Sequence, residues 1–219
     1  DLHLSIRRQR QMCIRDRLSG GVREASSNKK LAKCTYSYLS NKDNLKADLF
    51  NDLTTGVPFV SEAEEELPKA LSRARESLIN SKKVIVFTPV LNGGYAPSLK
   101  NALDWLSLSF DNYEYNELYK WKKVAVMSSV LGQGGNSQDA RNMLWHQLEK
   151  YGFLFFKESY LLKNAEENIS HLTNESSEVY IEFTKFHEEI ILPKKLAKEA
   201  ENARPYRFAI GDLSIIHIS

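Results

Sequence analysis

The stretch KVIVFTPVLNGGYAPSLKNALDWLS, residues 83–107, constrains the fold more than any other part of the sequence. It opens with an apolar, β-branched run at 84–87, which is short enough for a strand buried on both faces. A loop with Asn-Gly-Gly at 92–94 follows, and Pro97 suits the first turn of a helix because its φ is fixed and it lacks an N–H. Strand, glycine-bearing loop and helix in this order predict a ligand crevice at the carboxyl end of a parallel strand.

Apolar strands and amphipathic helices alternate along the rest of the chain. This alternation predicts an α/β fold with a doubly wound parallel sheet. We expect the aromatic stretch 111–121 to be an exposed excursion and 158–174 to be irregular, before a last helix within 175–203. The expected strands lie at 44–53, 84–87, 124–127 and 153–156.

Both ends of the chain read as translated sequencing adapter. QMCIRDR at 11–17 is the in-frame reading of CAG ATG TGT ATA AGA GAC AG, the end of a transposon used in sequencing libraries. LSIIHIS at 213–219 differs by one residue from its reverse-strand reading. We therefore expect an adapter artefact at 1–17, one domain at 18–203 whose first strand is truncated or replaced by adapter, and a tail at 204–219 that ends in adapter. The alternative for the first segment is a basic arm that binds nucleic acid.

Setting these ends aside changes which classes of protein the composition allows. The whole chain has a formal net charge of +2, and without the five arginines and two aspartates of its first segment the charge is about −1. No basic bias then points to nucleic acid. Cys34 becomes the single cysteine, so we expect no internal disulfide and a cytoplasmic location. No apolar run reaches the length of a membrane span.

The first loop, which we define as residues 20–28, has the composition of an anion site. Two glycines lead into a predicted helix, whose free N–H groups and dipole favour a phosphate. An arginine in the loop adds the prospect of a bidentate contact. The candidate phosphate ligands are Gly20, Gly21, Arg23, Ser26, Ser27 and Asn28.

Two further loops share this Gly, Ser and Asn composition, and we call them the second loop (89–94) and the third loop (128–136). Each follows a predicted parallel strand, so all three loops are expected at one edge of the sheet, where they form one ligand site. The candidate ligand residues in these two loops are Pro89, Val90, Leu91, Asn92, Gly93, Ser128, Gly132 and Gly134.

The sequence does not match the motifs of other common nucleotide-binding, hydrolase or metal sites. The glycines of 132–135 lack the last glycine of G-x-G-x-x-G, because Ser137 stands in its place. The sequence has neither a P-loop nor the G-x-S-x-G of hydrolases. His146, His171 and His187 lack the spacing of metal ligands. We therefore expect no metal and no nucleophile.

Three segments carry a resemblance to the NAD(P)H-dependent FMN reductases. SGGVREASSNKKLA at 19–32 resembles that family's S-G-S-x-R-x-x-S-x-N-x-x-L. TPVLNGGYAPSLKNALDWLS at 88–107 is similar to its T-P-E-Y-N-G-S-x-P-x-x-L-K-N-A-I-D-W-L-S. VAVMSSVLGQGG at 124–135 resembles its third, Ser/Gly-rich loop. The likeness spans about 18 to 156.

This resemblance implies a flavodoxin-like FMN-binding domain with strand order 2-1-3-4-5 and helices on both faces. The FMN phosphate would sit on the first loop, the isoalloxazine along the second, and its pyrimidine edge near the third. NADPH or NADH would pass a hydride to the flavin in a ping-pong reaction. The flavin would then pass the electrons to a free flavin, a quinone, an azo dye or a metal oxyanion. The active form would be a homodimer or homotetramer. Flavin carries the redox chemistry itself, so no catalytic side chain is expected.

The sequence departs from the family pattern at three places, one of which is Pro97, one position later than the family proline. Gly21 replaces a serine, which removes one phosphate contact, and Val90 and Leu91 replace Glu-Tyr at the rim of the flavin. Two other functions therefore stay open: a flavodoxin-type electron carrier, and a diverged member without activity. A strongly acidic surface would favour a carrier, and the near-neutral charge argues against one.

Overall fold

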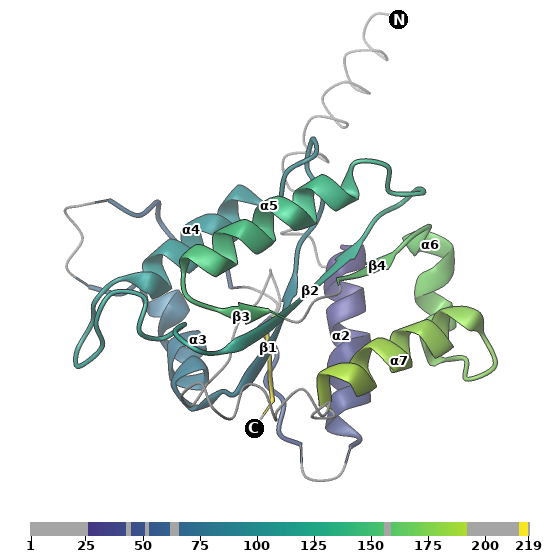
Figure 1. The fold of residues 1–219 in the computed structure, drawn as a ribbon, viewed down its shortest axis with the longest axis horizontal. Helices are drawn as coiled ribbons and strands as arrows, with labels where there is room; N and C mark the ends of the chain where they lie inside the picture. Colours follow the sequence, from purple (N-terminus) through teal and green to yellow (C-terminus); the bar gives the residue numbers. More distant parts are fainter. Residues whose placement is uncertain are drawn as a thin grey trace, which may run out of the picture.

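Two parallel strands form the centre of the sheet in the computed structural model (Figure 1). β1 (Lys83–Phe87) pairs with β2 (Lys123–Ser129) in register from Lys83↔Lys123 to Phe87↔Met127. Apart from the first residue of each, both strands are buried throughout, which confirms the expectation from their apolar runs. The structure describes residues 26–42, 45–50, 53–61, 66–155 and 159–191, and the backbone of 215–218.

Successive residues of these strands enter two separate hydrophobic cores. Val84 and Val86 belong to one core, and Ile85 and Phe87 to the other. β2 alternates in the same way, because neighbouring side chains of a strand point to opposite faces. Both faces must therefore be covered by helices.

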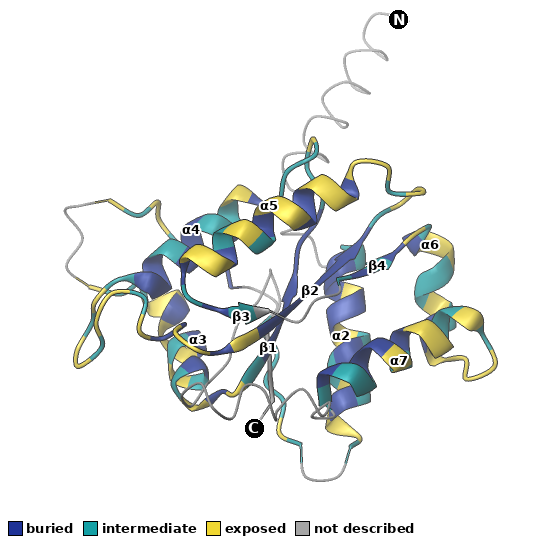
Figure 2. Cartoon of the chain, in the orientation of Figure 1, coloured by how far each residue is buried: buried dark blue, intermediate teal, exposed yellow. Residues whose placement is uncertain are grey.

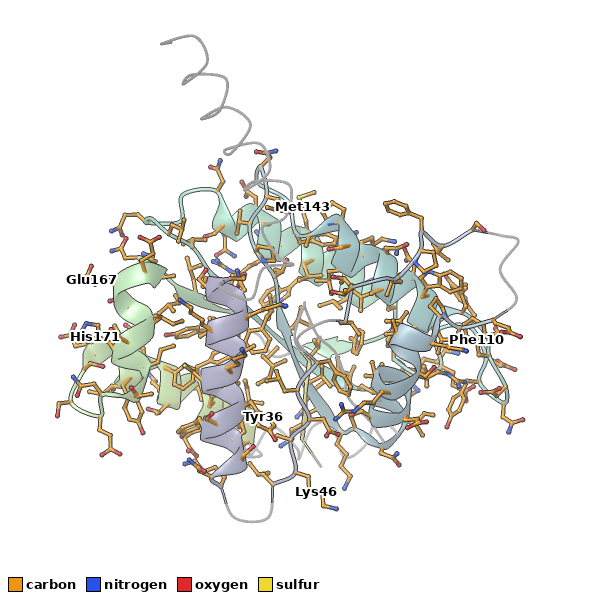
Figure 3. All side chains as sticks on the ribbon, turned by 180° about the vertical axis from the view of Figure 1, so that it is seen from behind. Tyr36, Lys46, Phe110, Met143, Glu167 and His171 are labelled. Atoms are coloured by element: carbon orange, nitrogen blue, oxygen red, sulfur yellow. The ribbon has the colours of Figure 1, made fainter. Side chains whose placement is uncertain are left out.

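Helices cover both faces, as predicted for a doubly wound sheet (Figure 2). α3, α4 and α5 pack on one face, and α2, α6 and α7 on the other, where α2 with Tyr36 lies in front of the sheet in the view from behind (Figure 3). No helix in the described ranges is long and apolar enough to cross a membrane. The helices are α2 (Ser27–Ser40), α3 (Lys69–Asn80), α4 (Pro97–Ser107), α5 (Ser137–Lys150), α6 (Ala165–Asn168) and α7 (Glu178–Ile191), with a 3₁₀ helix η1 (Ile169–Thr173).

Two short strands, β3 (Leu154–Phe155) and β4 (Tyr160–Leu162), lie on the other side of β2. Both run parallel to it, β3 beside its beginning and β4 beside its end. β3 confirms the expected strand at 153–156. The expectation of an irregular 158–174 was wrong, because this stretch forms β4, α6 and η1.

The free side of β1 is occupied by β5 (Ile215–Ile218), which runs antiparallel to it. The observed order is β3-β2-β1-β5, with β4 also on β2. The predicted order 2-1-3-4-5 counts the truncated first strand as strand 1 and the strand at 84–87, observed as β1, as strand 3. In that order, the position beside β1 belongs to the first strand, which runs parallel to it. The expected strand at 44–53 is not observed, since the described residues 45–50 contribute only the bridge residue Leu49.

Helix α4 connects the sheet to the loop at 57–60. It begins at Pro97, as predicted, and buries Leu99 among its apolar residues. Its buried polar residue Asn101 donates to Pro58 O at 2.7 Å and accepts from the Val60 N–H at 2.9 Å. The indole of Trp105 donates to the same carbonyl at 2.8 Å. The K-N-A-x-D-W segment thus serves to attach a loop from an earlier part of the chain.

The aromatic stretch 111–121 is only partly the exposed excursion expected of it. Tyr115 and Trp121 are exposed, but Tyr119 is fully buried and its hydroxyl donates to Leu103 O at 2.6 Å. Its ring packs against that of Phe153 at a centroid distance of 4.9 Å. The stretch therefore covers one of the two hydrophobic cores instead of projecting into solvent.

The second core contains a buried histidine between α2 and α7. His187 is fully buried, and its Nδ1–H donates to Phe183 O at 2.6 Å. That bond fixes the tautomer, so Nε2 accepts from the Thr35 hydroxyl at 3.2 Å. Burial, against a smaller opposite effect of the Phe183 carbonyl, lowers the pKa of His187 from 6.5 to about 4. The imidazole is neutral in the folded protein at neutral pH.

This histidine makes the stability depend on pH in a defined direction. The unfolded chain binds the proton at higher pH than the folded one, so the contribution is complete above pH 6.5 and is lost as the pH falls toward 4. We expect the unfolding free energy to fall in this window with a slope of up to about 1.4 kcal/mol per pH unit. Urea unfolding at several pH values measures it.

The His187→Gln variant should lose this part of the pH dependence. The exposed His146 offers a matched control, and its Gln variant should keep the wild-type slope. Equal slopes for the two variants would contradict the assignment.

Candidate functional site

The carboxyl ends of β1 and β2 lie side by side and open toward the same edge of the sheet (Figure 1). The Thr88 N–H donates to Met127 O at 3.0 Å and so extends the pairing by one residue. The second and third loops consequently leave the sheet as neighbours, with Pro89 next in the chain after Thr88 and Ser128 next after Met127.

The amino end of α2 is bonded to this same edge. Asn28 is buried; its Oδ1 accepts from the Ser129 N–H at 2.9 Å and its Nδ2 donates to Ser129 O at 3.3 Å. The Ser129 hydroxyl donates to Ser27 Oγ at 2.8 Å. The end of the first loop and the third loop are thereby joined across 101 positions of sequence.

The first loop itself is described only in part. Ser26 precedes α2 as its N-cap position, and Ser27 and Asn28 form the first turn, where backbone N–H groups face outward along the helix axis. Such a terminus favours an anion. Gly20, Gly21 and Arg23 lie outside the described residues.

The second loop is a tight hairpin turn with a fixed shape. Leu91 and Gly94 exchange two backbone hydrogen bonds of 2.8 and 2.9 Å. Between them Asn92 and Gly93 both have positive φ, 50° and 81°, which is the pattern of a type I′ turn and explains the Asn-Gly pair. At the base, the buried Thr88 hydroxyl donates to Pro89 O and accepts from the Ala96 N–H.

The third loop is attached to the segment after β4. The Val130 N–H donates to Leu162 O at 2.9 Å, and the Ala165 N–H to Val130 O at 2.9 Å. The Asn164 N–H donates to Gly132 O at 3.0 Å. Two of these bonds use carbonyls of the loop and one uses the Val130 N–H, whereas the backbone N–H groups of 131–136 donate to no residue that the structure describes.

One side chain at this edge is left without a hydrogen bond among the described residues. Ser128 is fully buried, and its hydroxyl has no partner there. A buried hydroxyl without a partner costs free energy, but protein atoms cover this one completely, so it is not open to a ligand at the surface. The open N–H groups of 131–136 are the donors that this edge offers to a ligand with acceptor atoms.

Charge is absent from this part of the site. The second and third loops contain no Asp, Glu, Lys or Arg. Val90 and Leu91 are partly buried, and Leu131 is 67% exposed, so the rim is aliphatic. Within the described ranges, no group of His, Cys, Asp or Glu is arranged to hold a metal ion. The site can bind and orient a ligand, but its two described loops offer no acid, base or nucleophile.

Sequence reasoning missed two residues of this edge. Ser129 holds α2, and Thr88 shapes the second loop. The adjacent hydroxyls at 128–129 and the Thr-Pro pair at 88–89 were the available signals, but neither shows which distant group each one bonds.

Comparisons with known proteins give a family and a fold for this chain. The family model described as NADPH-dependent FMN reductase matches residues 17–167, which is more than half of the chain. The comparison with curated proteins finds no match. Among solved structures, the chain is similar to FerB, a flavoenzyme NAD(P)H:(acceptor) oxidoreductase from Paracoccus denitrificans. The two are 21% identical with a TM-score of 0.52, and the match covers 78% of this chain and 94% of FerB.

The bonds of Asn28 can be tested by substitution. Asn28→Ala leaves the N–H and the carbonyl of Ser129 without their partner in a buried place, which should lower the unfolding free energy by about 1–3 kcal/mol. Asn142→Ala on the exposed side of α5 removes an amide of the same size and is the control. Urea unfolding measures both, and equal losses would refute the role of Asn28.

Proposed function

The chain belongs to the NADPH-dependent FMN reductase family, and from this premise we propose that it passes electrons from NAD(P)H through FMN to a small uncharged acceptor of the quinone type, by a ping-pong reaction. It is an FMN-dependent NAD(P)H oxidoreductase with a flavodoxin-like fold. The observation that supports the proposal is the group of open N–H donors at 131–136, at the edge of the sheet to which the amino end of α2 is also bonded.

FMN binding is proposed for all three loops. The phosphate would lie on the first loop, on Gly20, Gly21, Arg23, Ser26, Ser27 and Asn28. The isoalloxazine would lie along Pro89, Val90, Leu91, Asn92 and Gly93, and its pyrimidine edge near Ser128, Gly132 and Gly134. The rigid turn of the second loop and the open amides of 131–136 support these assignments.

Each loop contributes binding and orientation. Bound FMN supplies the redox chemistry, since it accepts a hydride from NAD(P)H and delivers electrons to a second substrate. The turn at Asn92 and Gly93 presents backbone without bulky side chains, which leaves a face for the nicotinamide. The amides of the third loop offer hydrogen bonds to a heterocyclic edge, and Ser128 lies at the start of that loop. This division of work requires no catalytic acid from the two described loops.

The rim favours an uncharged acceptor. Val90 and Leu91 stand where the family pattern has Glu-Tyr, and the exposed Leu131 adds a third aliphatic side chain. An apolar rim gains free energy by covering a flat apolar ring, and it offers no opposite charge to an oxyanion such as chromate. Quinones therefore match this rim better than metal oxyanions.

Enzyme assays test the proposal directly. The purified chain is mixed with FMN, freed of excess flavin and assayed for NADPH oxidation with 1,4-naphthoquinone and with chromate. We expect a yellow protein with kcat/KM at least about tenfold higher for the quinone, a difference of about 1.4 kcal/mol. Parallel double-reciprocal plots are expected for the ping-pong order.

The other outcomes are equally informative. A yellow protein that does not oxidise NAD(P)H would show an electron carrier, and a colourless one would show an emptied site. Chromate as the better acceptor would contradict the argument from the rim. Sedimentation of the same preparation tests the expected homodimer or homotetramer.

A negative charge at the rim should weaken the preference for the quinone over chromate. Val90→Glu places a carboxylate where the quinone ring is proposed to lie, so the KM for naphthoquinone should rise about tenfold. Val90→Thr keeps the size and branching of valine without the charge, and its KM should stay within about threefold of wild type. Similar KM values for both variants would remove Val90 from the acceptor site.

A further inference from the structure

Arg141 of α5 is a buried cation, and no carboxylate among the described residues pairs with it. The residue is 6% exposed. Its guanidinium donates to Ser159 Oγ at 2.7 Å, to Gln138 Oε1 at 2.6 Å and to Ser137 Oγ at 3.1 Å. All three acceptors are neutral, and no ion pair of Arg141 exists with any residue in the described ranges.

A short series of hydrogen bonds leads from Arg141 to the third loop. Ser137 accepts from the guanidinium, and its own hydroxyl donates to Gly134 O at 2.5 Å. The Ser137 N–H donates to the same carbonyl at 3.0 Å. Gly134 is thus held at the point where the third loop enters α5.

Gly134 occupies a position that has no room for a side chain. Its φ is +77°, and a Cβ there would lie 2.9 Å from Ser137 Oγ, 3.0 Å from Leu161 Cδ2 and 3.2 Å from Val130 Cγ2. The carbonyl of Gly134 faces the serine that Arg141 holds. The contact between Ser137 and Gly134 therefore holds the backbone that carries the open N–H groups of 131–136. Arg141 supports this contact through its bond to Ser137.

Stability alone does not explain a charge at this position. A buried cation normally has an anionic partner, because removal from water costs several kcal/mol that neutral hydroxyls repay only in part. Burial also lowers the pKa of Arg141, yet an arginine remains charged at neutral pH. A ligand that gains negative charge near the third loop would supply an anionic partner that the described residues do not provide.

We propose that Arg141 is a positioning residue of the flavin site, which holds the third loop in its binding conformation and whose positive charge favours reduced over oxidised FMN. The inference rests on the proposed function. It assigns two separable effects to one side chain. The hydrogen-bonded fork sets the affinity for both forms of FMN, and the positive charge sets the ratio between them, because reduced flavin carries more negative charge at its pyrimidine edge.

Two substitutions separate the effects. Arg141→Gln removes the charge, and the ratio of the dissociation constants for reduced and oxidised FMN should rise about tenfold, which lowers the midpoint potential by about 30 mV for a two-electron couple. Arg141→Lys keeps the charge without the planar fork. Its affinity for oxidised FMN should fall several-fold, while the ratio stays within about twofold of wild type.

Fluorescence of FMN measures the affinity for the oxidised form, and equilibration with a reference dye measures the midpoint potential. Ser159→Ala tests the positioning role with Arg141 intact, and it should weaken FMN binding at an unchanged potential. Arg75→Gln removes another arginine, which pairs with Asp111 away from the three loops, and it should leave affinity and potential unchanged. Circular dichroism at each step shows whether a variant is folded.

Distinct results would overturn the proposal. An unchanged potential in a folded Arg141→Gln variant would refute the role of the charge, and equal shifts in the Gln and Lys variants would assign the effect to geometry alone. Wild-type affinity in Ser159→Ala would refute the positioning role, even where both Arg141 variants fail to fold. A wild-type chain that binds no FMN would instead refute the proposed function, so the two failures are distinguishable.

Discussion

Parallel hydrogen bonding between β1 and β2 determines where every described ligand group lies. Both strands are apolar on both faces, so alternation of apolar and polar residues cannot select their register. Polar contacts at the carboxyl end favour the observed register: the Thr88 N–H reaches Met127 O, and Asn28 satisfies both backbone groups of Ser129. Because these contacts are buried, a slip of one residue would leave several polar groups without partners. The site and the register thus depend on the same bonds.

The fold could be predicted where a short segment carries its own physical explanation. The apolar runs of β1 and β2 and the proline start of α4 need no distant partner to be recognised. β4 has three residues, too few to show a period, and the antiparallel direction of β5 depends on which sheet edge is free. Tyr119 belongs to a stretch of mixed polar and aromatic residues, and its burial depends on contacts with distant residues, the bond to Leu103 O and the ring contact with Phe153.

The same distinction applies to the site. That the second and third loops share an edge follows from parallel strands, and the type I′ turn follows from Asn-Gly, so both could be predicted. The bond between Asn28 and Ser129 spans 101 positions, and no local pattern identifies such a pair. Arg141 was missed for the same reason: it stands in a polar helical segment, and its burial depends on Ser159 of another element. A single sequence shows which groups are present, whereas packing decides which of them lie at the site.

The distribution of charge gives this site its character. The two described loops carry no charge and expose aliphatic side chains, while the cation of Arg141, which has no carboxylate partner among the described residues, lies buried in the first turns of α5. A neutral surface imposes little desolvation cost on an apolar substrate that must arrive and leave. A buried charge acts on a bound group through a low dielectric, where its effect is larger than at an exposed position. Separating the two lets the rim select the acceptor and the interior influence the flavin, so a change at Val90 and a change at Arg141 should act on different properties of one enzyme.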